Sequence, residues 1–241
     1  DGGGRAPGAP FAFGEGRVLR YLFPLGLGAA GAAVLISLGL WQLQRLEWKE
    51  GLLAEIEARI GAAPVALPAR PEPGADRYLP VRVTGTTGPE ELHVLVSQKG
   101  QGAGFRIVTA LETTSGRRIL LDRGFVPDEA KLAERAPLTA TFTGNLHWPD
   151  ERDRFTPDND TAGNWWYARD VAVMAGALDT EPVLLVASQS APPDPDVTPL
   201  PVGIEGIPND HLGYAIQWFG LALVWLGMTA FWLWRMSRRA G

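Results

Sequence analysis

The sequence predicts a membrane protein in which two transmembrane α-helices flank an extramembrane α+β domain with a mostly antiparallel, barrel-like sheet. Two stretches, 21–44 and 212–234, contain no charged residue. Each can cross a hydrocarbon core of about 30 Å, because a helix rises about 1.5 Å per residue. Between them lie short runs with strand character, separated by turn signals and bounded by proline-rich segments.

The composition excludes several classes of function. The 241 residues carry a net charge of −5, which argues against nucleic acid as a partner. The chain has no cysteine, which excludes a disulfide, a thiolate metal site and a cysteine nucleophile. The length fits one extramembrane domain together with two membrane anchors.

Basic residues beside the two apolar stretches predict the orientation in the membrane. They lie before the first stretch and after the second, at Arg17, Arg20, Arg235, Arg238 and Arg239. Because basic flanks stay on the inner side, both termini are expected inside and the central domain outside. The abundance of Ala, Gly, Arg and Pro indicates a bacterial inner membrane with a periplasmic domain. In a mitochondrion the domain would face the intermembrane space.

The N-terminal part is expected to contain a tail and the first membrane helix. Residues 1–16, rich in Gly, Ala and Pro, are expected to be disordered. Residues 17–62 are expected to form a helix that spans the membrane at about 21–44 and continues as an amphipathic extension. This apolar stretch is longer than that of a signal peptide, and no clear cleavage site precedes its polar flank. Small residues suited to close helix packing are Gly26, Gly28, Ala30 and Ala32.

The middle of the chain is expected to form one β-rich domain. Residues 63–77 contain four prolines and are expected to be a linker, the domain is expected at 78–190, and a proline-rich connector at 191–208. The predicted strands cover 78–87, 92–97, 105–112, 117–122, 138–146 and 182–188. Two short helices are predicted, one at 128–135 and one running to 178 from an N-cap at Asp170.

Residues 209–234 are expected to form the second transmembrane helix, with a cytoplasmic basic tail at 235–241. Residues seven apart lie almost above one another on a helix. One such stripe consists of His211, Trp218, Trp225 and Trp232. A second consists of Gly213, Gly220 and Gly227, on nearly the opposite side, where a neighbouring helix can approach closely. As an alternative, Trp225 and Trp232 are anchors that face lipid or the membrane interface.

No motif indicates an enzyme, since G-x-S-x-G and H-E-x-x-H are both absent, and the chain has three histidines. His93 and His147 lie in or beside predicted strands and are interpreted as packed or surface residues. His211 lies at the entrance of the second apolar stretch, where an imidazole can ligate the iron of a porphyrin while aromatic rings pack on the macrocycle. The alternative is a histidine that binds lipid headgroups or caps the helix together with Asn209 and Asp210.

Five sequence blocks carry a resemblance to a known family. They are LGLWQLQRLEWK at 38–49, GFRIVTAL at 104–111, LDRGFVP at 121–127, NWWYARD at 164–170 with its continuation to Met174-Ala175, and NDHLGYAIQWF at 209–219. In this order they resemble the signatures of the surfeit locus protein 1 family, the cytochrome c oxidase assembly factors. Ala110 stands where the family pattern has proline, and Phe125 where it more often has tryptophan. The resemblance spans nearly the whole chain, and the last block is the most specific.

The resemblance implies a two-helix membrane protein that helps to build the haem a centre of cytochrome c oxidase subunit I and catalyses no reaction. In bacterial relatives, the histidine that matches His211 is implicated in binding haem a received from haem A synthase. We therefore expect His211 to be the axial ligand of a transiently bound haem a, with Tyr214 and Trp218 as neighbours and Arg45 as a propionate partner. Arg45 has an alternative role as an interfacial anchor on membrane lipids. The alternative for the whole protein is a cofactor-free scaffold that steadies subunit I.

Overall fold

The chain divides into two compact units, which are described separately. The computed structural model describes residues 15–98, 100–204 and 207–239. The helix unit contains the chain up to Leu52 and from Ile207, and the sheet unit contains Leu53–Gly206. The expected disordered tail lies outside the described residues except at positions 15 and 16, which belong to the first helix.

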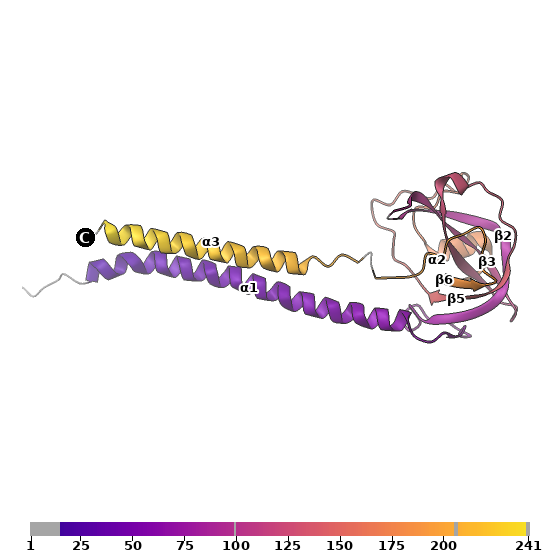
Figure 1. The fold of residues 1–241 in the computed structure, drawn as a ribbon, viewed down its shortest axis with the longest axis horizontal. Coiled ribbons are helices and arrows are strands. Elements are labelled where there is room, and N and C mark those ends of the chain that lie inside the picture. Colours follow the sequence, from indigo (N-terminus) through magenta and orange to yellow (C-terminus); the bar gives the residue numbers. More distant parts are fainter. Residues whose placement is uncertain (1–14, 99, 205–206, 240–241) are drawn as a thin grey trace, which may run out of the picture. The chain divides into compact units, whose positions relative to one another are not determined.

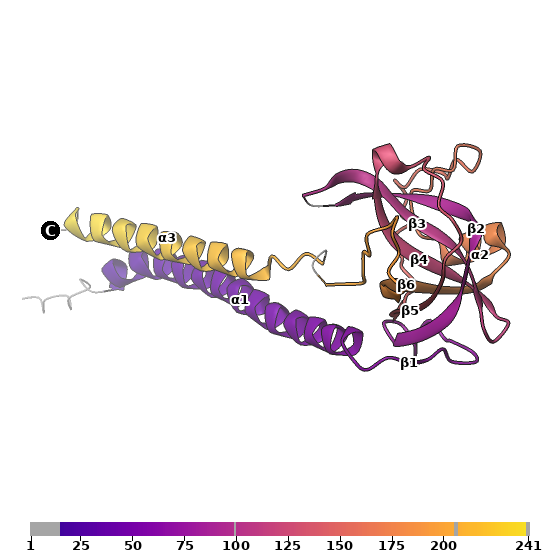
Figure 2. The same ribbon diagram turned by 45° about the vertical axis from the view of Figure 1, so that its right-hand side comes forward.

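The helix unit consists of two long helices, α1 (Glu15–Ile60) and α3 (His211–Arg238), which run antiparallel and side by side (Figures 1 and 2). Both are long and apolar enough to cross a membrane. Helix α1 is continuous through Pro24 to Ile60, beyond the unit boundary. Helix α3 extends past the expected end at 234, and Arg235 and Arg238 lie in its last turn. Basic side chains there interact favourably with the negative end of the helix dipole.

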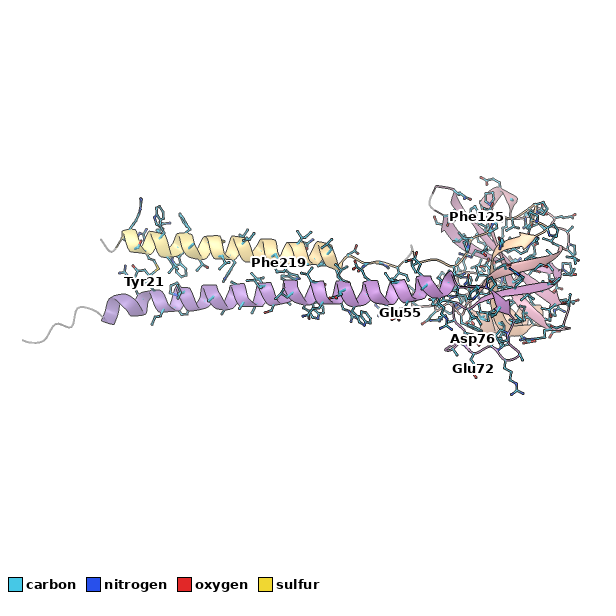
Figure 3. All side chains as sticks on the ribbon, turned by 60° about the horizontal axis from the view of Figure 1, so that its bottom comes forward. Tyr21, Glu55, Glu72, Asp76, Phe125 and Phe219 are labelled. Carbon is cyan, nitrogen blue, oxygen red and sulfur yellow. The ribbon has the colours of Figure 1, made fainter. Side chains whose placement is uncertain are left out.

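The two helices pack through glycines of α1 rather than through those of α3. A Cβ at Gly39 would lie 2.7 Å from the ring of Phe219, which is labelled in Figure 3, and one at Gly31 would lie 2.5 Å from Cε2 of Trp225. In contrast, nothing lies within 4 Å of the Cβ positions of the α3 glycines 213, 220 and 227. The prediction that the α3 glycine stripe receives a neighbouring helix is therefore wrong for α1, because large side chains of α3 fill the glycine face of α1.

Besides the end of α1, the described residues of the sheet unit form six strands, the helix α2 and one 3-10 turn. The elements are β1 (Val65–Ala66), β2 (Pro80–Gln98), β3 (Gly102–Thr113), β4 (Arg118–Pro127), η1 (Asp128–Ala130), β5 (Thr139–Leu146), α2 (Val171–Leu178) and β6 (Glu181–Ala191). The strand order is β1-β2-β3-β4-β6-β5, and β2 also pairs with β5 through its N-terminal half. Figure 2 shows the long curve of β2 beside these strands.

The structure corrects the barrel-like description of this domain. Most ladders are antiparallel, as predicted, but β1–β2 and β4–β6 are parallel, and the result is a mixed sheet rather than a barrel. The parallel β4–β6 pair arises because β6, which runs antiparallel to β5, pairs on its other side with β4. In an up-and-down barrel every strand is antiparallel to both of its neighbours.

Three local predictions also change. The runs expected as separate strands at 78–87 and 92–97 form one strand, β2, whose register with β3 shifts between Thr87 and Glu91, beside Gly88 and Pro89. The expected linker contains β1, and the helix expected at 128–135 shortens to η1. The connector pairs with β4, since the backbone N–H of Phe125 donates to the carbonyl of Thr198 at 2.7 Å.

Both faces of the sheet carry a hydrophobic core. Successive residues of β4 and β6 alternate between two clusters, so that Leu120 and Leu184 pack in one and Leu121 and Leu185 in the other. Helix α2 covers the first cluster and buries Met174 in it. Strands buried on both faces read as nearly continuous apolar runs, which explains the sequences ILL in β4 and VLLVA in β6.

Candidate functional site

The helix unit places His211 against the first helix. His211 is the first residue of α3, and its Nδ1 lies 2.8 Å from Oε1 of Gln42 in α1. Both side chains are half-buried. Among the described residues, Nε2 of His211 makes no hydrogen bond and is not one of the buried unpaired atoms. One ring nitrogen is thus held by the protein and the other remains accessible.

Polar groups surround this contact on the segment that precedes α3. Lys49 Nζ donates to the carbonyl of Pro208, which ties that segment to α1. Oδ1 of Asn209 is buried and has no hydrogen-bond partner among the described residues. Asp210 is the N-cap residue, but its side chain makes no capping hydrogen bond. The alternative in which His211 caps the helix together with Asn209 and Asp210 therefore lacks the side-chain contacts that capping requires.

The other predicted site residues lie on the two helices near His211. Tyr214 lies about one turn after His211 in α3 and is exposed. Trp218 lies about two turns after His211 and is half-buried. Arg45 lies one turn after Gln42 on α1, and its guanidinium carbon is 4.1 Å from the centroid of the Trp48 ring. This cation–π contact and the exposure of both side chains fit the anchoring alternative and leave the guanidinium accessible to an anion.

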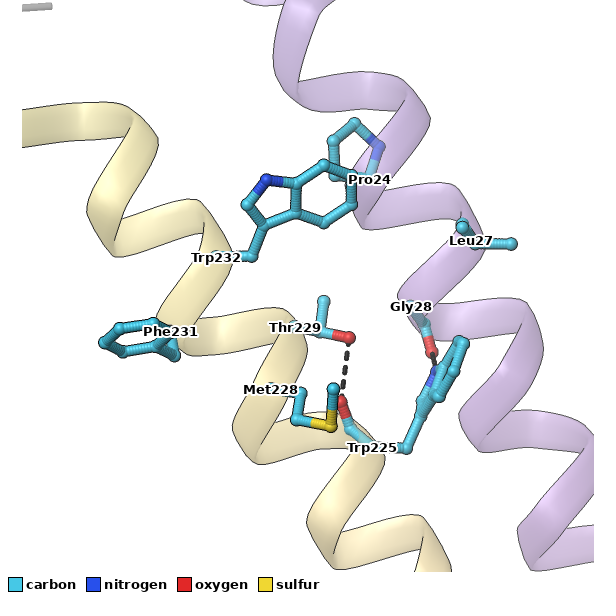
Figure 4. A pocket seen from close by; sticks show the side chains of 8 residues that line it. All are labelled: Pro24, Leu27, Gly28, Trp225, Met228, Thr229, Phe231 and Trp232. Atoms are coloured by element: carbon cyan, nitrogen blue, oxygen red, sulfur yellow. Dashed lines mark hydrogen bonds between the residues drawn. The ribbon is translucent and has the colours of Figure 1, made fainter. Parts of the chain in front are cut away.

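The next tryptophan of the stripe is part of the helix packing. Trp225 is half-buried, and its indole N–H donates to the carbonyl of Gly28 at 2.9 Å (Figure 4). This contact contradicts the alternative in which Trp225 is an anchor that faces lipid or the membrane interface, whereas Trp232 is 46% exposed. An apolar cavity of about 290 Å³ opens beside them, lined also by Pro24, Met228 and Phe231. It begins 14 residues from His211, or about 21 Å along the helix, so it cannot surround a ring that His211 ligates.

The two histidines of the sheet unit occupy packed positions. Nε2 of His93 lies 3.5 Å from a carboxylate oxygen of Glu91, and its ring is tilted against Phe105. His147 stacks on Tyr78 with ring centroids 5.3 Å apart. Burial, together with the nearby charges of Arg169 and Arg77, lowers the pKa of His147 to about 4. Both histidines are therefore structural, as the sequence indicated.

Charged residues from the resemblance blocks form a buried network instead of an open site. Asp122, which is fully buried, accepts from Arg106 at 2.7 Å and from Arg169 at 3.3 Å. Arg169 also pairs with Glu151. Burial alone would raise the pKa of Glu151, but the hydrogen bond and charge of Arg169 hold it below its usual value. These block residues stabilise the domain.

A second network links β2 to the connector. Arg123 is almost fully buried and binds Glu91 and Asp194, at 3.0 and 2.8 Å. Arg135 also binds Glu91, at 3.0 Å. Among the described residues no group of three or more His, Cys, Asp or Glu side chains is arranged to hold a metal ion. The buried carboxylates of these two networks, those of Glu91, Asp122 and Asp194, are thus paired with guanidinium groups.

Sequence reasoning missed Gln42. It lies within the first resemblance block, but neither its spacing nor its neighbours indicated a partner 169 residues away. Its helical position was informative, because Gln42 follows the packing glycine Gly39 by three residues and so lies on the same face of α1. Only the partner helix was unknown.

Comparisons with known proteins cover this region. A sequence model of the SURF1 family matches residues 29–223. Surfeit locus protein 1 of Homo sapiens is 32% identical in an alignment of 210 positions that covers 76% of this chain and 68% of the human protein. The protein of the same name from Xenopus tropicalis is 30% identical and covers 76% and 67% of the two chains. The SURF1-like protein of Monosiga brevicollis is 31% identical, with 77% and 78% covered. The matched region includes both Gln42 and His211.

Proposed function

The chain belongs to the SURF1 family, and from this premise we propose that it is a membrane-bound assembly factor for cytochrome c oxidase, which binds haem a through His211 and assists its insertion into subunit I. One observation supports this most directly. His211 lies at the end of an apolar helix, and its Nε2 has no hydrogen-bond partner among the described residues. Haem iron accepts an axial imidazole nitrogen, which is the ligand type that this residue provides.

The surroundings of His211 also suit a bound haem. Trp218 and Tyr214 lie on the same side of α3 as His211, within about two turns, and supply aromatic surface for the macrocycle. Arg45 supplies an accessible guanidinium for a propionate, which it can hold by charge-assisted hydrogen bonds. A single axial ligand suits a protein that must release its cargo. The protein would catalyse no reaction, because it binds haem a and passes it on.

The partners and the location belong to the same proposal. Helices α1 and α3 anchor the protein among membrane lipids of a bacterial inner membrane, with both termini in the cytoplasm and the sheet unit in the periplasm. Haem A synthase is the donor of haem a, and subunit I of the oxidase is the acceptor. A handover between membrane proteins requires contact through the membrane helices, and the outer faces of both helices are largely exposed.

The test is the visible absorption spectrum of the full chain, purified in detergent from cells that make haem A. We expect haem bands in the wild type that shrink or shift in His211→Ala. Leu212→Ala is the matched control, because Leu212 is the next residue of α3 and is 52% exposed. Added imidazole should restore the bands of His211→Ala, since it replaces the lost ligand.

Two outcomes would contradict the haem role. Equal haem content in wild type and His211→Ala would remove His211 as the essential ligand. No haem in either protein, with haem A present in the cells, would favour a second function, a cofactor-free scaffold for subunit I. The open glycine face of α3 supports that scaffold, because Gly213, Gly220 and Gly227 leave room for a partner helix. The scaffold predicts that His211→Ala assembles oxidase normally.

A further inference from the structure

We infer that Gln42 is a positioning residue for the haem ligand, because its amide oxygen accepts the Nδ1 proton of His211 and so turns an unprotonated Nε2 outward. This inference rests on the proposed function and names the residue that prepares His211 for it. Gln42 itself touches neither the iron nor the macrocycle. Its role is to select one form of the imidazole and to hold the ring in one orientation.

The hydrogen bond determines which nitrogen carries the proton. Oε1 of Gln42 is a carbonyl oxygen and can only accept, so the group opposite it, Nδ1 of His211 at 2.8 Å, must be the donor. A neutral imidazole carries one N–H, and the hydrogen bond made by one nitrogen fixes the state of the other. Nε2 therefore keeps its lone pair, which is what coordination requires.

Cross-helix contacts on both sides of the pair fix the position of Gln42. On one side Gly39 receives the ring of Phe219, and on the other Lys49 binds the carbonyl of Pro208. Sliding or rotating either helix would break both contacts along with the hydrogen bond. Gln42 is also half-buried in this interface, whereas Gln44, two residues further along α1, is exposed.

An amide partner is chemically suited to a ligand that must release its metal. Hydrogen-bond partners of a ligating histidine orient the ring and raise its basicity. A carboxylate in this position would do so strongly, because its negative charge draws the Nδ1 proton, whereas a neutral amide does so weakly. Gln42 thus orients His211 for binding without strengthening the iron–nitrogen bond as much as glutamate would.

The first test needs no haem. Full-length protein labelled with ¹⁵N-histidine in detergent reports the protonation of each ring nitrogen, and comparison with His211→Ala assigns the signals of His211 among three histidines. We expect an Nδ1–H, Nε2-unprotonated form in the wild type and in Gln44→Leu. In Gln42→Leu, which keeps the size of the side chain but removes the acceptor, we expect a mixture. An Nε2–H form in the wild type, or the same form in all three proteins, would overturn the inference.

The second test uses haem-loaded protein. Loss of such a partner typically weakens metal binding by about 10- to 100-fold, so Gln42→Leu should retain haem more weakly by that factor and Gln44→Leu should match the wild type. The iron–histidine stretching frequency of the ferrous protein should fall in Gln42→Leu and rise in Gln42→Glu. A purely structural role would weaken both Gln42 variants and leave the frequency unchanged, which would contradict the inference.

The two tests separate failure of the inference from failure of the proposed function. Haem bound through His211 with identical spectra in the wild type and Gln42→Leu would leave the proposed function intact and remove the role of Gln42. Absence of haem from the wild type would overturn both, and the tautomer measurement would still show whether Gln42 holds the ring.

Discussion

The helix unit and the sheet unit hold their parts together by different means. In the sheet unit, apolar side chains are buried on both faces of the sheet, and buried ion pairs join the strands to the connector. In the helix unit, only 6% of the most apolar stretch of α3 is buried. There the helices meet at the glycines of α1 and through side-chain hydrogen bonds to backbone carbonyl groups, such as that from the Trp225 indole to the carbonyl of Gly28. The sheet unit is organised for stability, and the helix unit leaves most of its surface available to lipid, cofactor or protein.

The histidines show the same difference at single residues. His147 is packed against Tyr78 among guanidinium groups, and its pKa is lowered to about 4. His211 is half-buried, with one nitrogen bound to Gln42 and the other accessible. The ligand role proposed for His211 needs accessibility together with fixed orientation, and His211 has both, whereas His147 is packed.

The largest effect is expected from Asp122→Ala. The substitution leaves Arg106 and Arg169 without the fully buried carboxylate that binds both of them. Breaking a buried pair in this way costs about 3–5 kcal/mol. Urea unfolding of the full chain in detergent, followed by tryptophan fluorescence, should show this loss in the free energy of unfolding.

Asp158→Ala is the matched control for that measurement. Asp158 also pairs with an arginine, Arg152, but its side chain is 99% exposed. Exposed pairs contribute about 0–1 kcal/mol, so this variant should unfold close to the wild-type midpoint. Similar losses in the two variants would show that the buried network does not stabilise the sheet unit.

A smaller effect is expected from acidification. The pKa of His147 is about 4 in the folded chain, against an ordinary value of 6.5. The unfolded chain therefore takes up a proton first, and stability is lost as the pH falls from 6.5 toward 4. Between pH 7 and pH 5 the loss should be about 2 kcal/mol. Denaturation curves at both pH values measure it directly.

His147→Gln tests the assignment of this pH dependence. A neutral side chain at position 147 should flatten the stability profile between pH 7 and pH 5. The pKa values of Glu91 and Glu151 are lowered below their usual range, so these carboxylates stay ionised over this pH window. Their contribution to the stability of the fold is lost only at more acidic pH. A slope that persists in His147→Gln would mean that another group titrates in this window.

In the helix unit, Gly31→Leu should separate the two helices. Its side chain would enter the space that the Trp225 indole occupies, and overpacking of this kind costs about 1–3 kcal/mol. The chain lacks cysteine, so cysteines placed at Arg20 and Met236, where the two helices touch, allow a bis-maleimide to measure their proximity. Gly26→Leu is the control, since the space at Gly26 is open. Equal cross-linking in both variants would contradict the glycine-mediated packing.

The sequence predicted the elements better than their contacts. The two apolar helices and the strands β3, β5 and β6 were predicted close to their observed bounds, because charge-free length and alternation are local properties. The parallel pairing of β6 with β4 was missed, since it depends on contacts between residues as distant in sequence as Leu120 and Leu184. Similarly, the stripes on α3 were found correctly, but which of them faces α1 depends on the glycines of the partner helix.

The candidate site was predicted in part for the same reason. His211 could be singled out from its place at the end of an apolar stretch. Gln42 could not, because its significance lies in a contact across 169 residues. Arg106, Asp122 and Arg169 belonged to the resemblance blocks, but the sequence does not show that they are buried together.

The smallest effect is expected from the N-cap residues of the helices α2 and α3, which differ in their capping hydrogen bonds. In α2 the side chain of the N-cap Asp170 accepts from the backbone N–H of Val173 at 3.2 Å, as predicted. Loss of such a cap costs about 1 kcal/mol, so Asp170→Ala should lower the stability of the sheet unit by that amount in urea. Asp210, the N-cap of α3, makes no such bond, so Asp210→Ala should change neither helix proximity nor haem retention. A clear loss of haem in Asp210→Ala would show that the segment before His211, rather than Gln42 alone, orients the ligand.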